Sequence, residues 1–323
     1  MLALRLTEIG QAPKLATVQR PEPRSGELRL KIAACGLNFA DLLMIDGRYQ
    51  ERPALPLTLG MEVAGVVDAL GPGTLGPAPG TRVAVFAGQG GLAEYGCFAT
   101  DRCQKIPDRM SFEQAAAFQI AYGTGHLALT RRAKLQAGET LLVTGAAGGV
   151  GLTAVEIGKA LGARIIAVAR GADRLAVARA AGADHLIDSD SPDLAAQFKA
   201  LGGVDVAYET IGGAIFDAAL RATRPEGRIL AIGFAGGTVP QIPANILLVK
   251  NITVIGFYWG GYGGFAPGVL SASLSELLGW YADGRLHPHV SHVLPLAQAP
   301  EALTLLRDRR ATGKVVVRCD QAE

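Results

Sequence analysis

The feature that most constrains this chain is a run of alternating strand and helix patterns that begins near Gly123. Helices are expected to end at Gly162 and Gly182, a third opens with Ser191 as its N-cap and Pro192 in its first turn, and a fourth covers 213–223. The strands between them are expected at 140–144, 164–169, 185–188, 204–208, 228–232 and 252–256. Strands joined through helices pair in parallel, so this region predicts an α/β fold with a doubly wound parallel sheet.

The segments on either side have a different character. Short strands with Gly and Pro turns between them are expected from Leu2 to about Tyr122, as in 27–32, 62–68 and 80–86. After residue 260 the pattern is mixed, with helices at 274–283 and 299–309 and strands at 289–294 and 313–318. The simplest partition places a nucleotide-type domain, 123–260, between two pieces of a β-rich domain, 1–122 and 261–323.

Composition and charge narrow the possible partners. Lys and Arg total 31 against 29 for Asp and Glu, and no basic run is interleaved with aromatic residues, so a nucleic-acid groove is not supported. The stretch 229–275 holds one charge, Lys250, but its prolines and the run Gly260–Gly264 would interrupt a membrane-spanning helix. We therefore expect small-molecule partners and no membrane.

The N-terminus and the cysteines bear on the compartment. The first residues lack the charged head, apolar stretch and cleavage site of a signal peptide, so a cytoplasmic location is expected. The cysteines lie at 35, 97, 103 and 319 without a Cys-x-x-Cys pair, which argues against a disulfide framework or a structural zinc lobe. Free, buried thiols are the simplest interpretation.

A glycine-rich loop follows the first strand of the central region. The segment Thr144-Gly-Ala-Ala-Gly-Gly-Val-Gly151 lies where that strand ends and a helix opens. Small residues let the backbone turn sharply and approach a pyrophosphate, whose charge is met by N–H groups at the helix start. The sequence therefore predicts a dinucleotide site, for which we assign Ala146, Ala147, Gly148, Gly149, Val150 and Gly151.

The end of the next strand indicates which dinucleotide binds. A site for NAD usually has Asp or Glu there, whereas this chain has Ala169 and Arg170, with Arg174 one turn on. Arginines can hydrogen-bond a 2′-phosphate as planar, permanent cations. The prediction is NADPH, with two solvated surface arginines as the alternative and Asp173 as the residue that opposes it. Ser189 is also assigned to the cofactor.

These features together resemble the medium-chain dehydrogenase/reductase superfamily and, within it, the quinone oxidoreductase and zeta-crystallin branch. The first signature runs from Gly138-Glu to Gly151, followed by Lys159, and departs from the family at Glu156, where Gln is usual. The second is Gly36-Leu-Asn-Phe-Ala-Asp41 with Gly47-Arg-Tyr49. The resemblance implies a Rossmann domain inserted in a β-rich GroES-like catalytic domain.

The second signature also bears on metal binding. In the zinc-dependent alcohol dehydrogenases of the superfamily, Cys occupies the place of Asn38 and His the place of Met61. Without a thiolate and an imidazole there, a catalytic zinc lacks its usual ligands, so no metal is expected. The cluster His287, His289 and His292 is interpreted as surface or packing residues, since His292 would point away from the other two on a strand.

A short-chain dehydrogenase would also satisfy the glycine pattern. That family places the loop near its N-terminus and needs Tyr-x-x-x-Lys downstream, which no later tyrosine supplies here. This alternative is therefore disfavoured.

The resemblance also suggests the reaction and its residues. Asn38 and Tyr49 are expected near the nicotinamide and substrate, where an amide or a hydroxyl can donate to a developing oxyanion. The alternatives are that Asn38 is a turn residue and that Tyr49 packs in the core. Tyr122 is interpreted as a substrate-contacting residue, against ordinary packing, and Asp41 as a structural residue. The nicotinamide end is expected beside Gly233, Phe234 and Ala235 and beside Phe257, Tyr258 and Trp259.

With no metal to polarise a carbonyl, a quinone is the expected hydride acceptor. An enone or enoyl-thioester reductase is the alternative, for which the cluster Arg131-Arg-Ala-Lys134 is the one local hint of a CoA entrance. A non-catalytic, crystallin-like NADPH binder is a more remote reading. The strand at 252–256 lies where this family pairs subunits, so a homodimer is expected.

Overall fold

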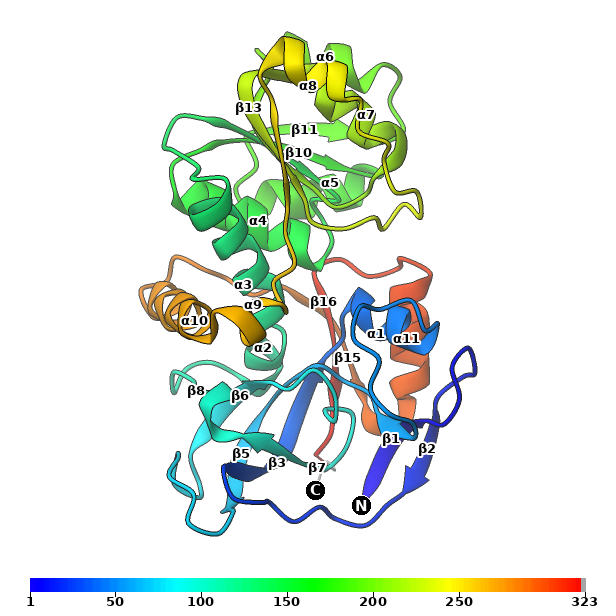
Figure 1. Cartoon of the computed structure of the whole chain (residues 1–323), viewed down its shortest axis with the longest axis vertical. Helices are drawn as coiled ribbons and strands as arrows, with labels where there is room; N and C mark the ends of the chain where they lie inside the picture. Colours follow the sequence, from blue (N-terminus) through cyan, green and yellow to red (C-terminus); the bar gives the residue numbers. More distant parts are fainter. Residues whose placement is uncertain (321–323) are drawn as a thin grey trace. The chain divides into compact units, whose positions relative to one another are not determined.

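The computed structural model of the chain describes residues 1–320, and these form two compact units. The first unit is Met1–Ile120 together with the chain from Pro288 onward, and the second is Ala121–His287. The expected return to the first domain at residue 261 falls inside the second unit, because the helix that follows packs within that unit. Figure 1 shows the two units with the chain coloured from blue to red.

The second unit contains a six-stranded sheet in the order β11-β10-β9-β12-β13-β14, and every neighbouring pair is parallel. Its strands are β9 (Thr140–Thr144), β10 (Arg164–Ala169), β11 (His185–Asp188), β12 (Val204–Glu209), β13 (Thr223–Ala231) and β14 (Thr253–Gly256). The helices of the unit are α4 (Gly149–Ala160), α5 (Ala172–Ala180), α6 (Leu194–Ala200), α7 (Gly213–Ala222), α8 (Ala244–Lys250), α9 (Tyr262–Phe265) and α10 (Pro267–Ala282). The doubly wound parallel sheet is therefore confirmed.

The chain enters this unit through α3 (Gln119–His126), which continues as a π-helical turn, Leu127–Arg132. The core on one side of the sheet is built from apolar residues of β9, β10, β12 and β13 with Phe198 of α6 and Phe216 of α7. Short strands buried on both faces read as continuous apolar runs, as in Leu141-Leu-Val143.

The predicted start of the helix after β11 was wrong. Helix α6 begins at Leu194 with Asp193 as its N-cap, not with Ser191. The Asp193 carboxylate accepts a hydrogen bond from Ala196 N at 3.1 Å, and Pro192 lies before the cap. Asp caps a helix as well as Ser does, so the choice between two neighbouring caps depends on backbone geometry.

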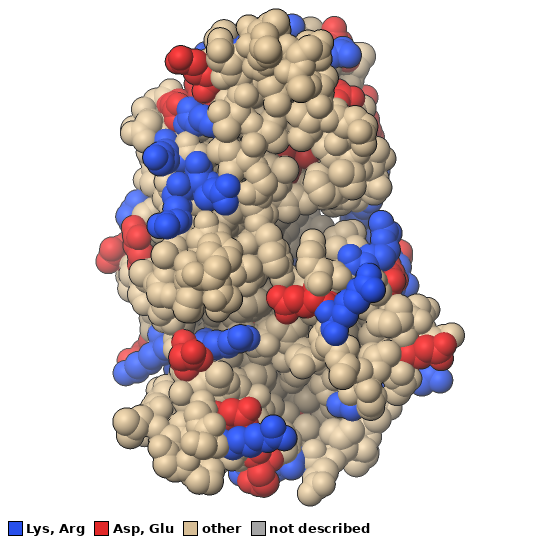
Figure 2. All heavy atoms as spheres, in the orientation of Figure 1, with Lys and Arg blue, Asp and Glu red and all other residues tan. Residues whose placement is uncertain are grey.

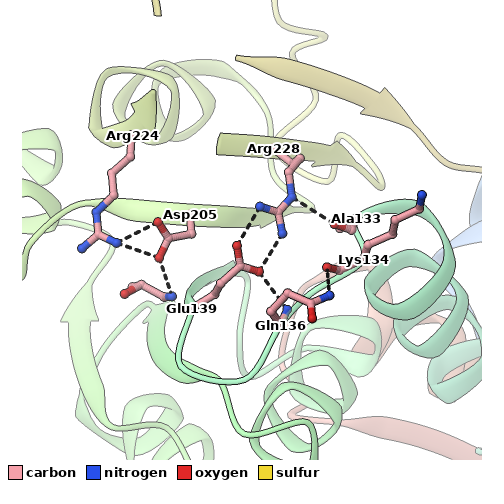
Figure 3. Close-up of polar contacts among 8 residues, drawn as sticks. Ala133, Lys134, Gln136, Glu139, Asp205, Arg224 and Arg228 are labelled. Carbon is pink, nitrogen blue, oxygen red and sulfur yellow. Dashed lines mark hydrogen bonds and ion pairs between the residues drawn. The ribbon is translucent and has the colours of Figure 1, made fainter. Parts of the chain in front are cut away.

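A polar cluster fixes the amino ends of the strands in the second unit (Figure 3). Arg224 donates to Asp205, whose carboxylate also accepts from Thr140 N at 2.8 Å. Arg228 makes a two-bond pair with Glu139 at 2.8 and 2.7 Å. Strands β9, β12 and β13 are thus tied together at this edge of the sheet, and the carboxyl ends of the same strands carry the loops considered below.

The first unit holds a seven-stranded sheet in the order β15-β16-β3-β5-β6-β8, with β7 paired to β3, and a three-stranded sheet in the order β2-β1-β4. The strands are β1 (Leu2–Leu6), β2 (Lys14–Thr17), β3 (Glu27–Gly36), β4 (Leu57–Thr58), β5 (Glu62–Leu70), β6 (Arg82–Phe86), β7 (Tyr95–Ala99), β8 (Cys103–Lys105), β15 (Val290–Pro295) and β16 (Lys314–Arg318). The helices are α1 (Phe39–Ile45), α2 (Phe112–Ala116) and α11 (Ala299–Arg307). Strand β16 pairs with β3, so the end of the chain completes the sheet begun near its start.

No helix within residues 1–320 is both long enough and apolar enough to cross a membrane.

Candidate functional site

The glycine-rich segment 144–151, here called the cofactor loop, joins β9 to α4 as predicted. Gly148 is the N-cap of α4, and no side chain caps this helix. The first bond inside the helix runs from Leu152 N to Gly148 O at 2.8 Å. The N–H groups of Gly149, Val150 and Gly151 precede that bond, so they are available to an anion.

The glycines of this loop are required by close packing. A Cβ atom on Gly151 would lie 2.2 Å from Gly145 O, and Gly145 itself has a φ of +61°. Any side chain at Gly151 would push α4 away from the loop. The backbone is therefore held in the tight turn that lets a pyrophosphate approach, and the residues present fit a dinucleotide.

Two of the assigned loop residues use their N–H groups inside the protein. Ala146 N donates to Val168 O at 3.0 Å, and Gly148 N donates to Gly145 O at 2.9 Å. These two residues can shape the turn, but their amides are not open donors.

The segment after β10 holds the two arginines assigned to the 2′-phosphate. The Arg170 side chain is 65% exposed, and its Nε lies 3.3 Å from an oxygen of Asp190. Ser189 lies beside Asp190, and its hydroxyl donates to the same carboxylate at 3.4 Å. The loop after β11 thus brings the carboxylate of Asp190 beside Arg170, although the end of β10 itself has no acidic residue. This contact could not be predicted from the end of β10 alone, because Asp190 belongs to a different loop.

The loop after β13 carries the next assigned group. Ala235 N donates to Thr210 O at 2.9 Å, which ties this loop to the one after β12, and Phe234 is 39% exposed. Gly233 lies in the same loop.

The aromatic segment after β14 carries the last assigned group. Phe257 and Trp259 are buried, whereas Tyr258 is 37% exposed. A Cβ atom on Gly123 would lie 2.6 Å from the Trp259 indole nitrogen, so Gly123 makes room for that ring. Tyr262 and Phe265 extend the cluster, with their ring centroids 4.6 Å apart.

In the first unit, Asn38 is the N-cap of α1 and belongs to a buried polar network. The Lys314 ammonium donates to Asn38 Oδ1, Glu62 Oε1 and Leu37 O, each at 2.7 Å. Asn38 Nδ2 donates to Glu62 Oε1 at 2.9 Å and weakly to Gly36 O at 3.4 Å. Because an ammonium can only donate, it fixes which end of the Asn38 amide is the oxygen.

Asp41 supports the same turn. Its carboxylate accepts from Asn38 N at 2.8 Å and from Gly60 N at 3.2 Å. Burial raises the pKa of Asp41 to about 7, against the opposing effect of those two N–H donors and of Lys314. Its place agrees with the structural role expected for it.

Tyr49 follows α1 and lies in the core of the first unit, with 9% of its surface exposed. Its backbone N–H donates to Leu43 O at 3.2 Å. The Tyr49 ring therefore packs in the core of the first unit, and any catalytic role would belong to its hydroxyl group alone.

Tyr122 lies in α3 and is buried, and its hydroxyl donates a short hydrogen bond to Glu156 Oε2. The other Glu156 oxygen accepts from His287 N at 2.8 Å. Burial and the neighbouring Glu156 raise the pKa of Tyr122 well above its usual value. The family departure at Glu156 thus supplies an acceptor for Tyr122, a role that the sequence did not suggest.

The structure brings the assigned residues together in two sets. The cofactor loop, Arg170, Ser189 and the loops after β13 and β14 follow strands of the second unit, while Asn38 and Tyr49 lie around α1 in the first. The residues that sequence reasoning missed are the buried partners Glu62, Lys314, Glu156 and Glu209. Glu62 and Lys314 are the first residues of β5 and β16, and Glu209 is the last residue of β12, each beside apolar positions of its strand. Glu156 lies inside α4, and its one signal was the departure from the family's Gln.

Across the described part of the chain, no group of three or more His, Cys, Asp or Glu side chains is arranged to hold a metal ion. The histidines considered above have other contacts: His289 with Thr312 at 3.0 Å and His292 with Ser291 at 2.9 Å.

Comparison with known proteins places these features in a family. Residues 24–108 match the family model described as the alcohol dehydrogenase GroES-like domain, and residues 149–278 match the zinc-binding dehydrogenase model. The quinone oxidoreductase-like protein 2 of Bos taurus is 39% identical over 295 residues, which cover 90% of this chain and 84% of that protein.

Solved structures agree. The quinone oxidoreductase of Thermus thermophilus, solved alone and with NADPH, is 36% identical with a TM-score of 0.87, covering 98% of this chain and 100% of that chain. The Escherichia coli quinone oxidoreductase complexed with NADPH is 27% identical with a TM-score of 0.89, covering 98% and 99% of the two chains.

Proposed function

The chain belongs to the medium-chain dehydrogenase/reductase superfamily, in its quinone oxidoreductase branch, and on that premise we propose that it reduces a quinone with NADPH and without a catalytic zinc. The observation that carries the proposal is the amino end of α4, which no side chain caps and where the close contact of Gly151 with Gly145 O leaves no room for a Cβ atom. Such a turn offers backbone donors to a pyrophosphate.

NADPH is the cofactor, and different residues of this chain would bind its pyrophosphate, its 2′-phosphate and its nicotinamide end. The amides of Gly149, Val150 and Gly151 would hold the pyrophosphate, with Ala146, Ala147 and Gly148 shaping the turn. Arg170 and Arg174 would face the 2′-phosphate, with Ser189 nearby. The nicotinamide end would lie against the assigned residues that follow β13 and β14, namely Gly233, Phe234, Ala235, Phe257, Tyr258 and Trp259.

The preference for NADPH over NADH is expected to depend on the two arginines. Replacing both in Arg170→Ala/Arg174→Ala removes charge-assisted hydrogen bonds of about 1.5 to 3 kcal/mol each, so kcat/KM for NADPH should fall by roughly tenfold or more while that for NADH stays unchanged. Arg179→Ala, at the exposed end of the same helix, is the matched control. A wild-type protein that uses NADH as efficiently as NADPH would contradict this assignment.

Zinc independence is supported by what surrounds Asn38. The Lys314 ammonium already lies 2.7 Å from the oxygens of Glu62 and Asn38, so a cation is built into this part of the chain. Met61, where the zinc enzymes of the superfamily have His, is buried and offers only a weak thioether acceptor. A second cation beside Lys314 would be repelled.

When bound, NADPH supplies a hydride, and a proton taken up at the acceptor oxygen completes the reduction. Asn38 has one amide hydrogen held only weakly, at 3.4 Å from Gly36 O, and this is the donor we assign to the developing oxyanion. Tyr49 is the proposed hydroxyl group near the acceptor. Tyr122 is not given this role, because its buried hydroxyl donates to Glu156 Oε2 and cannot meet a substrate. Within the nearly charge-free stretch 229–275, the buried rings of Phe257 and Trp259 would help to exclude water, whereas much of 232–251 is exposed.

A steady-state screen of NADPH oxidation tests the proposal, using protein treated with a chelator. Quinones are expected to be the best acceptors, with activity retained after chelation. Faster turnover of enones or enoyl-CoA esters would favour the alkene reductase instead. Turnover of no acceptor despite tight NADPH binding would indicate a non-catalytic binder.

A small-molecule partner also agrees with the surface. Figure 2 shows one face of the molecule, on which acidic and basic side chains are interspersed among much uncharged surface. We also propose that two copies of the chain pair through the open edge of the six-stranded sheet to form a homodimer.

A further inference from the structure

We propose that Glu209 is a positioning residue of the NADPH site. Its carboxylate fixes the loop after β12 against the cofactor loop and also places a negative charge at the start of α7. As a result, only α4 offers its amino end to the pyrophosphate. The inference rests on the proposed placement of the pyrophosphate at α4.

Glu209 is the last residue of β12 and is fully buried. Its Oε1 accepts from the Thr144 hydroxyl at 3.0 Å and from Ile211 N at 2.9 Å. Gly212 N lies 3.0 Å from each of the two carboxylate oxygens. Burial raises the pKa of Glu209, and the N–H donors of Gly212 and Ile211 oppose this rise by stabilising the carboxylate.

The partner hydroxyl belongs to the cofactor loop. Thr144 ends β9 and directly precedes Gly145, and its hydroxyl oxygen accepts from Thr210 N at 2.9 Å. The Thr210 hydroxyl in turn donates to Thr144 O at 2.8 Å. A Cβ atom on Gly145 would lie 2.6 Å from that hydroxyl, so the two loops are in close contact.

A third loop is fixed to the same segment. After β13, Ile232 N donates to Glu209 O at 2.9 Å and Gly236 N donates to Ile211 O at 2.8 Å. The segment from Glu209 to Ile211 is therefore the central member of three neighbouring loops. All three follow the carboxyl ends of adjacent parallel strands, where α/β sheets bind their ligands.

The start of α7 differs from the start of α4 in the charge placed beside it. Each helix follows one of two adjacent strands and has a glycine N-cap, Gly148 or Gly212. At α7 the Glu209 carboxylate binds the two amides that lead into the helix, and its charge complements the positive end of the helix dipole. At α4 no side chain does so. An anion is therefore repelled from α7 and accepted at α4.

The test compares Glu209→Gln with Asp217→Asn, which removes the same charge from an exposed position on α7. In Glu209→Gln the new amide group must face N–H or O–H donors, so at least one loop contact is lost. We expect the Kd for NADPH, measured by fluorescence titration, to rise about tenfold or more in Glu209→Gln and to stay unchanged in Asp217→Asn.

A second ligand separates positioning from general destabilisation. Adenosine 2′-monophosphate keeps the 2′-phosphate that the arginines after β10 would bind but has no phosphate on its 5′-oxygen, so its affinity should be unaffected in Glu209→Gln. Thr144→Val, which keeps the buried charge and loses the hydroxyl between the loops, should weaken NADPH binding in the same selective way.

Two results would overturn the inference: unchanged NADPH affinity in Glu209→Gln and Thr144→Val, or equal weakening of NADPH and adenosine 2′-monophosphate. Failure of the wild-type protein to bind NADPH would instead count against the proposed function itself.

Discussion

Lys314 is an unusual residue for its position, because Lys is seldom buried without a partner. Its side chain is 6% exposed, and Glu62 opposite it is fully buried. The three ammonium hydrogens have three oxygen acceptors at 2.7 Å, so the ammonium is fully hydrogen-bonded. A buried pair of this kind adds little net stability, but removing one member leaves an uncompensated charge.

We therefore expect Lys314→Met to lower the free energy of unfolding by about 3 to 5 kcal/mol, read from urea denaturation. The double variant Lys314→Met/Glu62→Gln removes the stranded charge as well and should recover a large part of the loss. Lys105→Met, at an exposed position on β8, is the control and should change stability by no more than about 0.5 kcal/mol. Equal stability of Lys314→Met and the wild type would contradict the network described here.

At the scale of residues, the sequence was informative where chemistry is local. The glycine-rich turn between β9 and α4 was predicted from local residues alone, because a sharp turn depends on neighbours in the chain, whereas the assignment of Asn38 came from the family resemblance. The partners of Asn38 could not, since Glu62 is 24 residues away and Lys314 is 276 residues away. Which charged residues meet in a core is decided by strand pairing, here of β16 with β3 and of β3 with β5.

At the scale of elements, α3 and α10 are joined by a histidine. The His126 ring is buried; its Nδ1 lies 2.8 Å from the Ser273 hydroxyl, and its Nε2 lies 3.6 Å from Glu276. Trp280 meets the ring edge-on at 5.2 Å between centroids. These contacts explain why α10 belongs to the second unit. They also bury the His126 imidazole between the two helices, which favours its neutral form.

This contact predicts a pH dependence of stability. Burial lowers the pKa of His126, and the nearby Glu276 opposes that change only in part. The unfolded chain therefore takes up a proton near pH 6.5 that the folded chain resists, so the stabilising contribution is complete above that pH and is lost as the pH falls below it. Melting temperatures between pH 5 and pH 8 should drop less steeply in His126→Gln than in the wild type, and parallel curves would contradict the assignment.

The elements themselves were predicted best where strands are short and apolar. The predicted bounds of β9, β10 and β11 match the structure residue for residue. Helix α10 starts at Pro267, seven residues before the predicted start at 274. Pro is favourable in the first turn of a helix, but the glycine run just before it made this segment look like a loop in the sequence. Boundaries set by caps and prolines depend on backbone geometry that periodicity does not encode.

At the scale of the whole molecule, the open edge of the six-stranded sheet is the main feature left to explain. Strand β14 pairs with β13 on one side, and no strand among residues 1–320 pairs with its other side. Nearby, α8 exposes 75% of Leu248 and 68% of Val249. An unpaired edge with apolar neighbours is a template for pairing with another chain.

We expect the protein to be a homodimer through β14, with twice the mass of one chain by light scattering after size exclusion. Phe257 N donates to Ala231 O of β13, and successive amides of a strand point to opposite sides, so the amide of Val254 faces the open edge. Val254→Pro removes that donor without breaking a bond to β13 and should give folded monomers whose melting temperature no longer depends on protein concentration. Ile255→Pro, whose amide faces β13, should instead break the sheet and lower the melting temperature well below that of the Val254→Pro monomer. A wild-type monomer, or a Val254→Pro dimer, would rule out this edge as the subunit contact.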